Sequence, residues 1–435
     1  MDTFRFQHEF RAVGHGTFFT GLVEAQDGAA FRWGYDCGSR SSNRIRDAID
    51  ELSWERRWRR DTTVDMMVVS HFDNDHVNGL EQFLETYRVK WLVLPYVGLK
   101  QRLAHAASLG DEDISSAATA GFAIDPIGYL DARGLSGRVD GVLLVQGGRG
   151  DGAVDGGDPL PDPTFLDGVR RDDRNDEAPD PTDPGQYRDR VLGGAAKEAR
   201  VLRRSHGQVV SVAGRFPFEF VFFNAALPES VANRSRRDMR QVARDVAAIF
   251  KRFDVLTAGR QPRRGWRAEL RACYDRHFGD SGAERNNISL CTLMRPLANA
   301  YPSICQLCDP WCGCEMVRCV NHWHAWPERY NGSQGLLLTG DLTLDDATLS
   351  EMQTHFGNAR WNQLQVVQVP HHGSRHSWFP GNALRFPDPA FVHCVPSNPG
   401  KYPRPHPDVA ADLRTSRVLH ADDDSPVIQT YFVDT

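Results

Sequence analysis

The fold is decided by the stretch Val68-Val69-Ser70-His71-Phe72-Asp73-Asn74-Asp75-His76-Val77-Asn78-Gly79. It begins in an apolar, β-branched run over residues 64–69, which predicts a buried strand. The strand ends in a polar turn whose imidazoles and carboxylates suit zinc, manganese or iron. The turn therefore predicts a metal site where a strand passes into a helix; the alternative is a solvated acidic turn with incidental histidines. The four candidate ligands are His71, Asp73, Asp75 and His76.

Strand and helix patterns alternate along the rest of the chain, which indicates a layered α/β fold. The first 38 residues predict a hairpin of strands, and residues 98–140 predict mostly helix without chemistry, with His105 as a surface residue. Further strands are predicted over residues 91–97, 208–224, 288–294, 336–341, 366–369, 390–396 and 427–432, and helices over residues 40–60, 80–87, 230–253 and 408–419.

The pattern H-x-D-x-D-H resembles the H-x-H-x-D-H signature of metallo-β-lactamase fold hydrolases, with Asp73 in place of the second histidine. This variant resembles the hydrolase domain of the ComEC-type DNA-uptake proteins. Motifs that resemble others of that domain follow in the same order. They are Thr339-Gly340-Asp341 at a strand end, Pro370-His371-His372-Gly373-Ser374 and Pro405-His406-Pro407, with residues 13–16 and 35–38 resembling its opening hairpin and residues 286–290 its N-N-x-S segment.

This resemblance implies an αββα sandwich, with two mixed sheets packed face to face and helices outside, as one domain over residues 1–435. It implies one or two divalent ions, zinc or manganese, held by His71, Asp73, Asp75, His76, Asp341 and His371. His71 and Asp73 would lie at one metal position and Asp75 and His76 at the other. Asp341 would bridge the two, and His371 or His372 would complete the second.

Two departures from the family pattern affect the metal. A carboxylate at Asp73 hardens the site, which favours manganese or magnesium relative to zinc. The family's middle histidine has no clear counterpart, and Asn287 stands nearest to it, as a weak ligand or a substrate contact. Asp36 lies near the metal site by resemblance, whereas a turn-capping role is equally open.

A bound divalent ion lowers the pKa of a water molecule and polarises the bond that the water attacks. We expect Asp75 to orient that water. We expect His372, Ser374 and His406 to contact a phosphate or to protonate the leaving group, although a structural role for His406 is equally open.

Three segments are predicted insertions. Residues 141–205 are acidic and rich in Gly, Asp and Pro, which indicates a disordered loop. Residues 228–285 are helical and basic, and form either a solvated face or a phosphate-backbone contact. Residues 296–334 carry a Cys/His cluster that indicates a structural zinc site, free or redox thiols, or a disulfide. The cluster consists of Cys305, Cys308, Cys312, Cys314, Cys319, His322 and His324.

The composition of the 435 residues is that of a soluble protein, with 40% hydrophobic residues and a net charge of −6, so no global basic field attracts nucleic acid. No apolar run is long enough to span a membrane, and the N-terminus lacks a signal-peptide pattern, so we expect a cytoplasmic protein without the membrane channel of the DNA-uptake proteins.

Three functions follow from these observations. The first is a metal-dependent phosphodiesterase or nuclease, acting on nucleic acid or a nucleotide phosphodiester. The second is a metal-dependent hydrolase of a non-phosphate ester, lactone or amide. The third is a non-catalytic docking module for a protein partner that the sequence does not identify.

Overall fold

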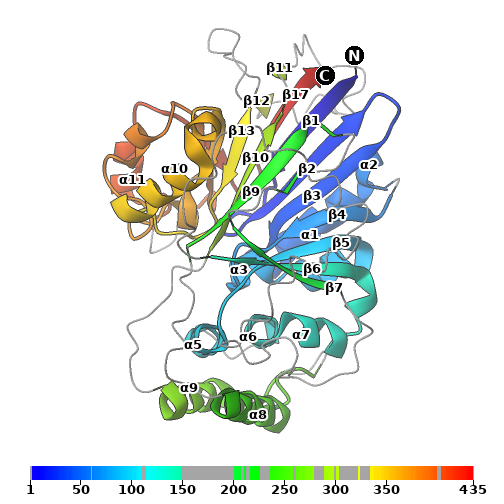
Figure 1. Cartoon of the computed structure of the whole chain (residues 1–435), viewed down its shortest axis with the longest axis vertical. Coiled ribbons are helices and arrows are strands. Elements are labelled where there is room, and N and C mark those ends of the chain that lie inside the picture. Colours follow the sequence, from blue (N-terminus) through cyan, green and yellow to red (C-terminus); the bar gives the residue numbers. More distant parts are fainter. Residues whose placement is uncertain are drawn as a thin grey trace.

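The computed structural model contains two sheets packed face to face, with helices on both outer faces (Figure 1). The protein is therefore a mixed α/β protein, as the alternation of strands and helices predicts. The described residues are 2–59, 61–109, 114–147, 200–206, 210–211, 216–225, 236–257, 261–278, 289–297, 300–302, 322–323, 334–398 and 403–434.

The first sheet has the strand order β11-β17-β1-β2-β3-β4-β5-β6-β7, and β12 pairs with β17. Strands β1 to β3 form an antiparallel meander, which contains the hairpin predicted for the first 38 residues, whereas β3 to β7 run parallel. The bounds are β1 Thr3–Phe10, β2 Phe18–Ala25, β3 Ala30–Cys37, β4 Thr63–Val68, β5 Arg88–Pro95, β6 Val139–Gln146, β7 Arg200–Ser205, β11 Ala300–Pro302, β12 His322–Trp323 and β17 Val427–Asp434.

The second sheet has the order β16-β15-β14-β13-β10-β9-β8, with β13 to β16 parallel and β8, β9 and β10 antiparallel. Strand β10, near residue 290, pairs with β13, which precedes Asp341. The bounds are β8 Val210–Ser211, β9 Phe218–Asn224, β10 Leu290–Pro296, β13 Gly335–Leu338, β14 Leu364–Gln368, β15 Ala390–Cys394 and β16 Arg417–Ala421.

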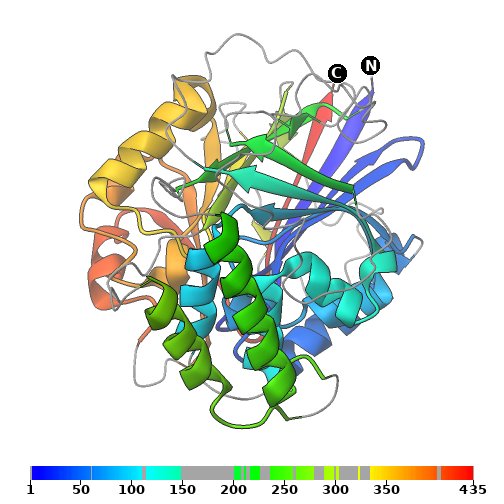
Figure 2. The ribbon, with the colours of Figure 1, turned by 60° about the horizontal axis from the view of Figure 1, so that its bottom comes forward.

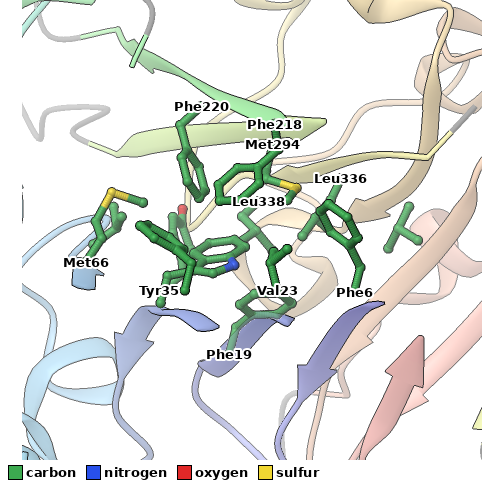
Figure 3. Packing of buried hydrophobic residues seen from close by; sticks show 14 of the residues in the cluster. Phe6, Phe19, Val23, Tyr35, Met66, Phe218, Phe220, Met294, Leu336 and Leu338 are labelled. Atoms are coloured by element: carbon green, nitrogen blue, oxygen red, sulfur yellow. The ribbon is translucent and has the colours of Figure 1, made fainter. Parts of the chain in front are cut away.

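The main core lies between the two sheets and is strongly aromatic (Figure 3). The ring of Phe6 on β1 lies 5.9 Å from that of Phe218 on β9, and Trp33 on β3 lies 4.9 Å from Phe220. These side chains alternate along their strands, because successive residues of a strand face opposite sides of the sheet. Phe31, Trp33 and Tyr35 on β3, and Phe218, Phe220 and Phe222 on β9, therefore face this core.

Two groups of helices cover the outer faces. Buried side chains of α1, α4 and α7 pack on the first sheet, and those of α10 and α11 on the second. The helices α8 and α9 form a smaller cluster with α5 and α6 beneath the sheets (Figure 2). The bounds are α1 Ser42–Trp54, α2 Arg56–Arg59, α3 Asn74–Val77, α4 Leu80–Thr86, α5 Leu99–Ser108, α6 Ile114–Ile124, α7 Pro126–Ala132, α8 Arg236–Phe253, α9 Trp266–Phe278, α10 Asp346–Trp361 and α11 Pro407–Asp412.

The helix predicted over residues 408–419 is wrong in its second half. Helix α11 ends at Asp412, and residues 417–421 form β16, which pairs in parallel with β15. Pairing at the sheet edge overrides the local helical pattern.

Several predictions lie outside the described residues or have little described structure. Asn287 and most of the acidic segment 141–205 lie outside them, as do the side chains of the predicted Cys/His cluster at residues 305–324. Among the helices that the structure does describe, none has the length and apolar character needed to cross a membrane.

Candidate metal centre

The candidate site lies where the carboxyl ends of parallel strands from both sheets meet. Asp36 stands at the end of β3, the H-x-D-x-D-H turn follows β4, Asp341 follows β13, and the two adjacent histidines follow β14. Loops at the carboxyl ends of parallel strands share one edge of a sheet, and here the edges of two sheets adjoin. Motifs far apart in the chain therefore come together.

The carboxylate of Asp36 holds the turn that carries the candidate ligands by hydrogen bonds. This fully buried residue has a φ of 54°, and its carboxylate accepts hydrogen bonds from the backbone N–H and the hydroxyl of Ser70, both at 2.7 Å. It also accepts one from Nδ1 of His76 at 2.7 Å. The carboxylate thus links the end of β3 to both ends of the turn, which supports the site role rather than turn capping.

One group of candidate ligands consists of His71, His76 and Asp341. Nε2 of His71 lies 3.7 Å from Oδ2 of Asp341, and Nε2 of His76 lies 3.1 Å from Oδ1. Two further side chains border the group: Oδ2 of Asp73 lies 3.5 Å from His71, and Nε2 of His371 lies 3.6 Å from Asp341.

A second group consists of His15, Asp75 and His372. Oδ2 of Asp75 lies 3.4 Å from Nε2 of His15 and 3.6 Å from Nε2 of His372. The ring centroids of His76 and His372 are 5.5 Å apart, so the two groups adjoin. Together they form one centre with two candidate positions.

The predicted grouping of the ligands differs from the one observed. His76 lies with His71 and Asp341, rather than with Asp75, and Asp75 lies with His372 as well as with His15. Asp75 and His76 are neighbours on α3, and consecutive residues of a helix are rotated by about 100°. Their side chains therefore point to different positions.

The histidines are held so that one ring nitrogen of each faces the carboxylates. The single hydroxyl proton of Ser70 goes to Asp36, so Nδ1 of His71, 2.9 Å from that hydroxyl oxygen, is a donor. Nδ1 of His76 donates to Asp36, and Nδ1 of His372 donates to the carbonyl oxygen of residue 394 at 2.8 Å. In the neutral form, each ring presents the lone pair of Nε2, as a metal ligand does.

Those lone pairs are buried and unused. Nε2 of His71, His76 and His372 and Oδ1 of Asp341 have no hydrogen-bond partner among the described residues, and the 3.1 Å approach of His76 to Asp341 is not in hydrogen-bond geometry. Buried polar atoms without partners are costly, at about 1–3 kcal/mol each. A divalent cation at the first position would satisfy the atoms of His71, His76 and Asp341, and one at the second would satisfy His372, so these residues fit a metal.

The site carries concentrated and opposed charge. Burial disfavours a charged His76, but the carboxylates of Asp341 and Asp36 outweigh burial and raise the pKa of His76 well above its ordinary value. Burial likewise disfavours a charged Asp75, but the neighbouring imidazoles of His15 and His372 hold its pKa well below the ordinary value. The carboxylates are therefore ionised, as metal ligation requires.

The other predicted residues occupy the margin of the centre. Ser374 is fully buried, and its hydroxyl accepts a hydrogen bond from the backbone N–H of His376 at 3.4 Å. His406 caps α11, with Nδ1 accepting from the N–H of Asp408 at 3.2 Å. Its own backbone N–H donates to Gly373, so its loop lies against the P-H-H-G-S segment.

The prediction that His105 is a surface residue is wrong. Its ring is mostly buried, and Nε2 lies 3.0 Å from the carbonyl oxygen of Phe72 and 3.3 Å from Oδ1 of Asp73. Helix α5 returns to the metal turn, so the residue has a partner that its own segment lacks. No sequence pattern marks this long-range contact.

Sequence reasoning also missed His15 as a member of the site. The sequence signal was the glycine that follows it, Gly16. The structure gives the reason for this glycine, because a Cβ at Gly16 would lie 2.5 Å from the backbone of Ser39. A Cβ at Gly38 would lie 2.5 Å from the carbonyl carbon of Asp75. Such close backbone approach is a common reason for glycine beside a site.

A third group, Asp245, Cys273 and His277, lies between α8 and α9. Here Nε2 of His277 is only 2.8 Å from Oδ2 of Asp245, and Arg276 lies 3.5 Å from the same oxygen. This geometry is that of an ion pair with its charge already neutralised. It differs from the first two groups, in which Nε2 of His71, His76 and His372 lacks a hydrogen-bond partner among the described residues.

No model of a known protein family matches the sequence, and no curated protein matches it. Among solved structures, the long form of RNase Z from yeast matches with a TM-score of 0.29 and 8% sequence identity. The match covers 84% of this chain, and the chain spans 32% of that protein's length. A likeness of that degree defines neither the fold nor the activity of this protein.

Proposed function

We propose that this chain is a metal-dependent hydrolase of the metallo-β-lactamase fold that cleaves phosphodiester bonds, as a nuclease or a nucleotide phosphodiesterase. One observation carries the metal-dependent part. Buried Nε2 and carboxylate atoms from three separate segments converge without hydrogen-bond partners among the described residues, while the opposite ring nitrogens are held in place.

The four-layer arrangement supports the fold assignment. Two mixed sheets pack face to face with helices on both outer faces, and the site lies at one edge of the pair. The order of the H-x-D-x-D-H, T-G-D and P-H-H-G-S motifs resembles the family's order, and each motif follows a strand of the sandwich.

In this proposal, His71, His76 and Asp341 hold one ion, with Asp73 and His371 at its margin. Asp75, His15 and His372 hold or border a second position. The ions, zinc or manganese, supply a water of lowered pKa and polarise the bond under attack. Asp75 lies 3.4 Å from His15 and 3.6 Å from His372, which hold its pKa low, so its carboxylate is ionised, as a group that orients a water molecule must be.

The buried Ser374 is placed to order the P-H-H-G-S turn rather than to touch a substrate. His406, on the loop against Gly373, is the better placed of the two to reach a leaving group. Asn287 remains a proposed substrate contact, and the Cys/His cluster at residues 305–324 a proposed structural zinc site.

The test is metal content and cleavage, measured together on the purified chain. We expect bound zinc or manganese, and hydrolysis of bis(4-nitrophenyl) phosphate and of single-stranded DNA, double-stranded DNA or RNA. Asp75→Asn is expected to remove hydrolysis. Asp346→Asn is the matched control, because the Asp346 side chain is 97% exposed and is not one of the candidate ligands.

Two results would overturn the proposal. One is a metal-loaded protein that hydrolyses a carboxylic ester or lactone but no phosphodiester, which would assign the second class of hydrolase. The other is a protein that binds no divalent metal.

A further inference from the structure

Two arginines flank the candidate centre from loops of different sheets. Arg40 follows β3, and its backbone N–H donates to the carbonyl oxygen of His15 at 2.8 Å. Its side chain is 70% exposed, and Nε lies 3.6 Å from Oδ2 of Asp75. Arg404 precedes Pro405, which packs against Gly373 of the P-H-H-G-S turn. Both guanidinium groups therefore stand on segments that contact the site.

One donor of the Arg404 guanidinium is unsatisfied. Its Nε is buried without a hydrogen-bond partner, and it forms no ion pair with any carboxylate in the described part of the chain. Burial lowers the pKa of Arg404, the charge of Arg40 lowers it further, and Asp341 opposes both. The guanidinium thus lies in the fields of another arginine and of a candidate metal ligand.

This arrangement fits an anion. Two like charges held near each other repel, and the repulsion is relieved when one negatively charged group lies between them. The planar guanidinium forms paired hydrogen bonds with phosphate oxygens, and such charge-assisted bonds are the strong ones. A neutral ester or lactone would leave the guanidinium of Arg404 uncompensated beside a cationic metal centre.

We propose that Arg40 and Arg404 form an anion subsite that binds a non-bridging oxygen of a substrate phosphodiester beside the candidate metal centre. This inference rests on the proposed function and narrows it, because it selects a phosphodiester over a carboxylic ester. The competing explanation is that Arg404 only balances the carboxylates of the site.

Inorganic phosphate is the probe that separates these explanations. Its dissociation constant is measured by isothermal titration calorimetry on the full chain as purified and with added manganese. We expect Arg404→Gln to weaken phosphate binding about 10–100-fold, the loss of a charge-assisted hydrogen-bonded pair. Arg404→Lys keeps the charge but not the paired geometry, so we expect an intermediate loss.

Arg414→Gln is the matched control, because this arginine is exposed and lies beyond the opposite end of α11. A charge-balancing role predicts altered metal content and melting temperature in Arg404→Gln with phosphate affinity unchanged. The subsite predicts weakened phosphate affinity with unchanged metal content and melting temperature, together with a raised KM for bis(4-nitrophenyl) phosphate.

The inference is overturned if Arg404→Gln and Arg40→Gln bind phosphate as tightly as Arg414→Gln, even when the wild-type protein cleaves phosphodiesters. If the wild-type protein cleaves none, yet Arg404 still sets the phosphate affinity, the anion subsite stands and the proposed reaction fails.

Discussion

Replacement of Asp36 by asparagine tests the architecture of the centre most directly. The carboxylate accepts from the backbone N–H of Ser70 on one oxygen, and from the Ser70 hydroxyl and Nδ1 of His76 on the other. Asparagine keeps the size and tolerates the φ of 54°, but it has only one accepting oxygen.

Either orientation of the new amide disturbs the centre. If its NH2 faces His76, Nδ1 must become an acceptor, so the proton moves to Nε2 and points at the metal position. If its NH2 faces the backbone N–H of Ser70, two donors oppose each other in a buried place. We expect metal affinity to fall about 10–100-fold, the usual effect of losing a group that orients a ligand.

Folding stability should fall as well. A hydrogen bond to a charged group contributes about 1.5–3 kcal/mol, and at least one such bond is lost. Metal affinity is measured by competition with a chromogenic chelator, and stability by urea unfolding of the metal-free protein.

Asp65→Asn is the matched control. Asp65 is also a buried acid, and it lies near the start of β4, away from the metal turn. Its carboxylate accepts from the N–H of Arg32 at 2.8 Å and pairs with Lys90 at 2.7 Å. Its replacement should lower stability and leave metal affinity unchanged. The reasoning fails if Asp36→Asn binds metal as tightly as Asp65→Asn does.

Three further predictions concern stability, each measured by urea unfolding. Gly38→Ala should cost about 1–3 kcal/mol and displace the metal turn, because its Cβ overlaps the backbone of that turn, whereas Gly137→Ala, with no atom within 4 Å, should be neutral within about 0.5 kcal/mol. Glu219→Ala should cost about 3–5 kcal/mol without changing metal content, because Glu219 is fully buried and pairs with Arg360 at 2.8 and 3.2 Å; a loss below 1 kcal/mol would contradict this. Burial lowers the pKa of His8 to about 4, so the unfolded state, in which the pKa of histidine is about 6.5, takes up a proton first as pH falls. The stability present above pH 6.5 is therefore lost toward pH 4, by about 1.4 kcal/mol between pH 8 and pH 5.5. His8→Phe should lack this loss, whereas a curve of stability against pH that runs parallel to that of the wild type would contradict the reasoning.

The sequence predicts the parts of this molecule that depend on neighbouring residues. The four candidate ligands of the metal turn are close in the chain, so a strand followed by a short helix brings them together whatever the rest does. The strands that line the core are visible for the same reason, since alternation along β3 and β9 is a local pattern.

Contacts between distant segments were not predictable in this way. His105 meets Asp73 only because α5 folds back on the turn. The N-N-x-S resemblance includes Ser289, but it does not predict that the Ser289 hydroxyl accepts from the N–H of Asp341 at 3.0 Å. His15 joins Asp75 across the edge of the first sheet. Each of these contacts depends on the path of the chain rather than on a pattern within one segment.

The division of ligands between two positions shows why a motif alone could not define the centre. Asp75 and His76 are adjacent in sequence, yet the helical rotation of α3 sends one toward His15 and His372 and the other toward His71 and Asp341. The same four-residue helix therefore serves both positions. A displacement of α3 must alter both at once, which is why Gly38, whose Cβ would meet the backbone of α3, is expected to matter as much as any ligand.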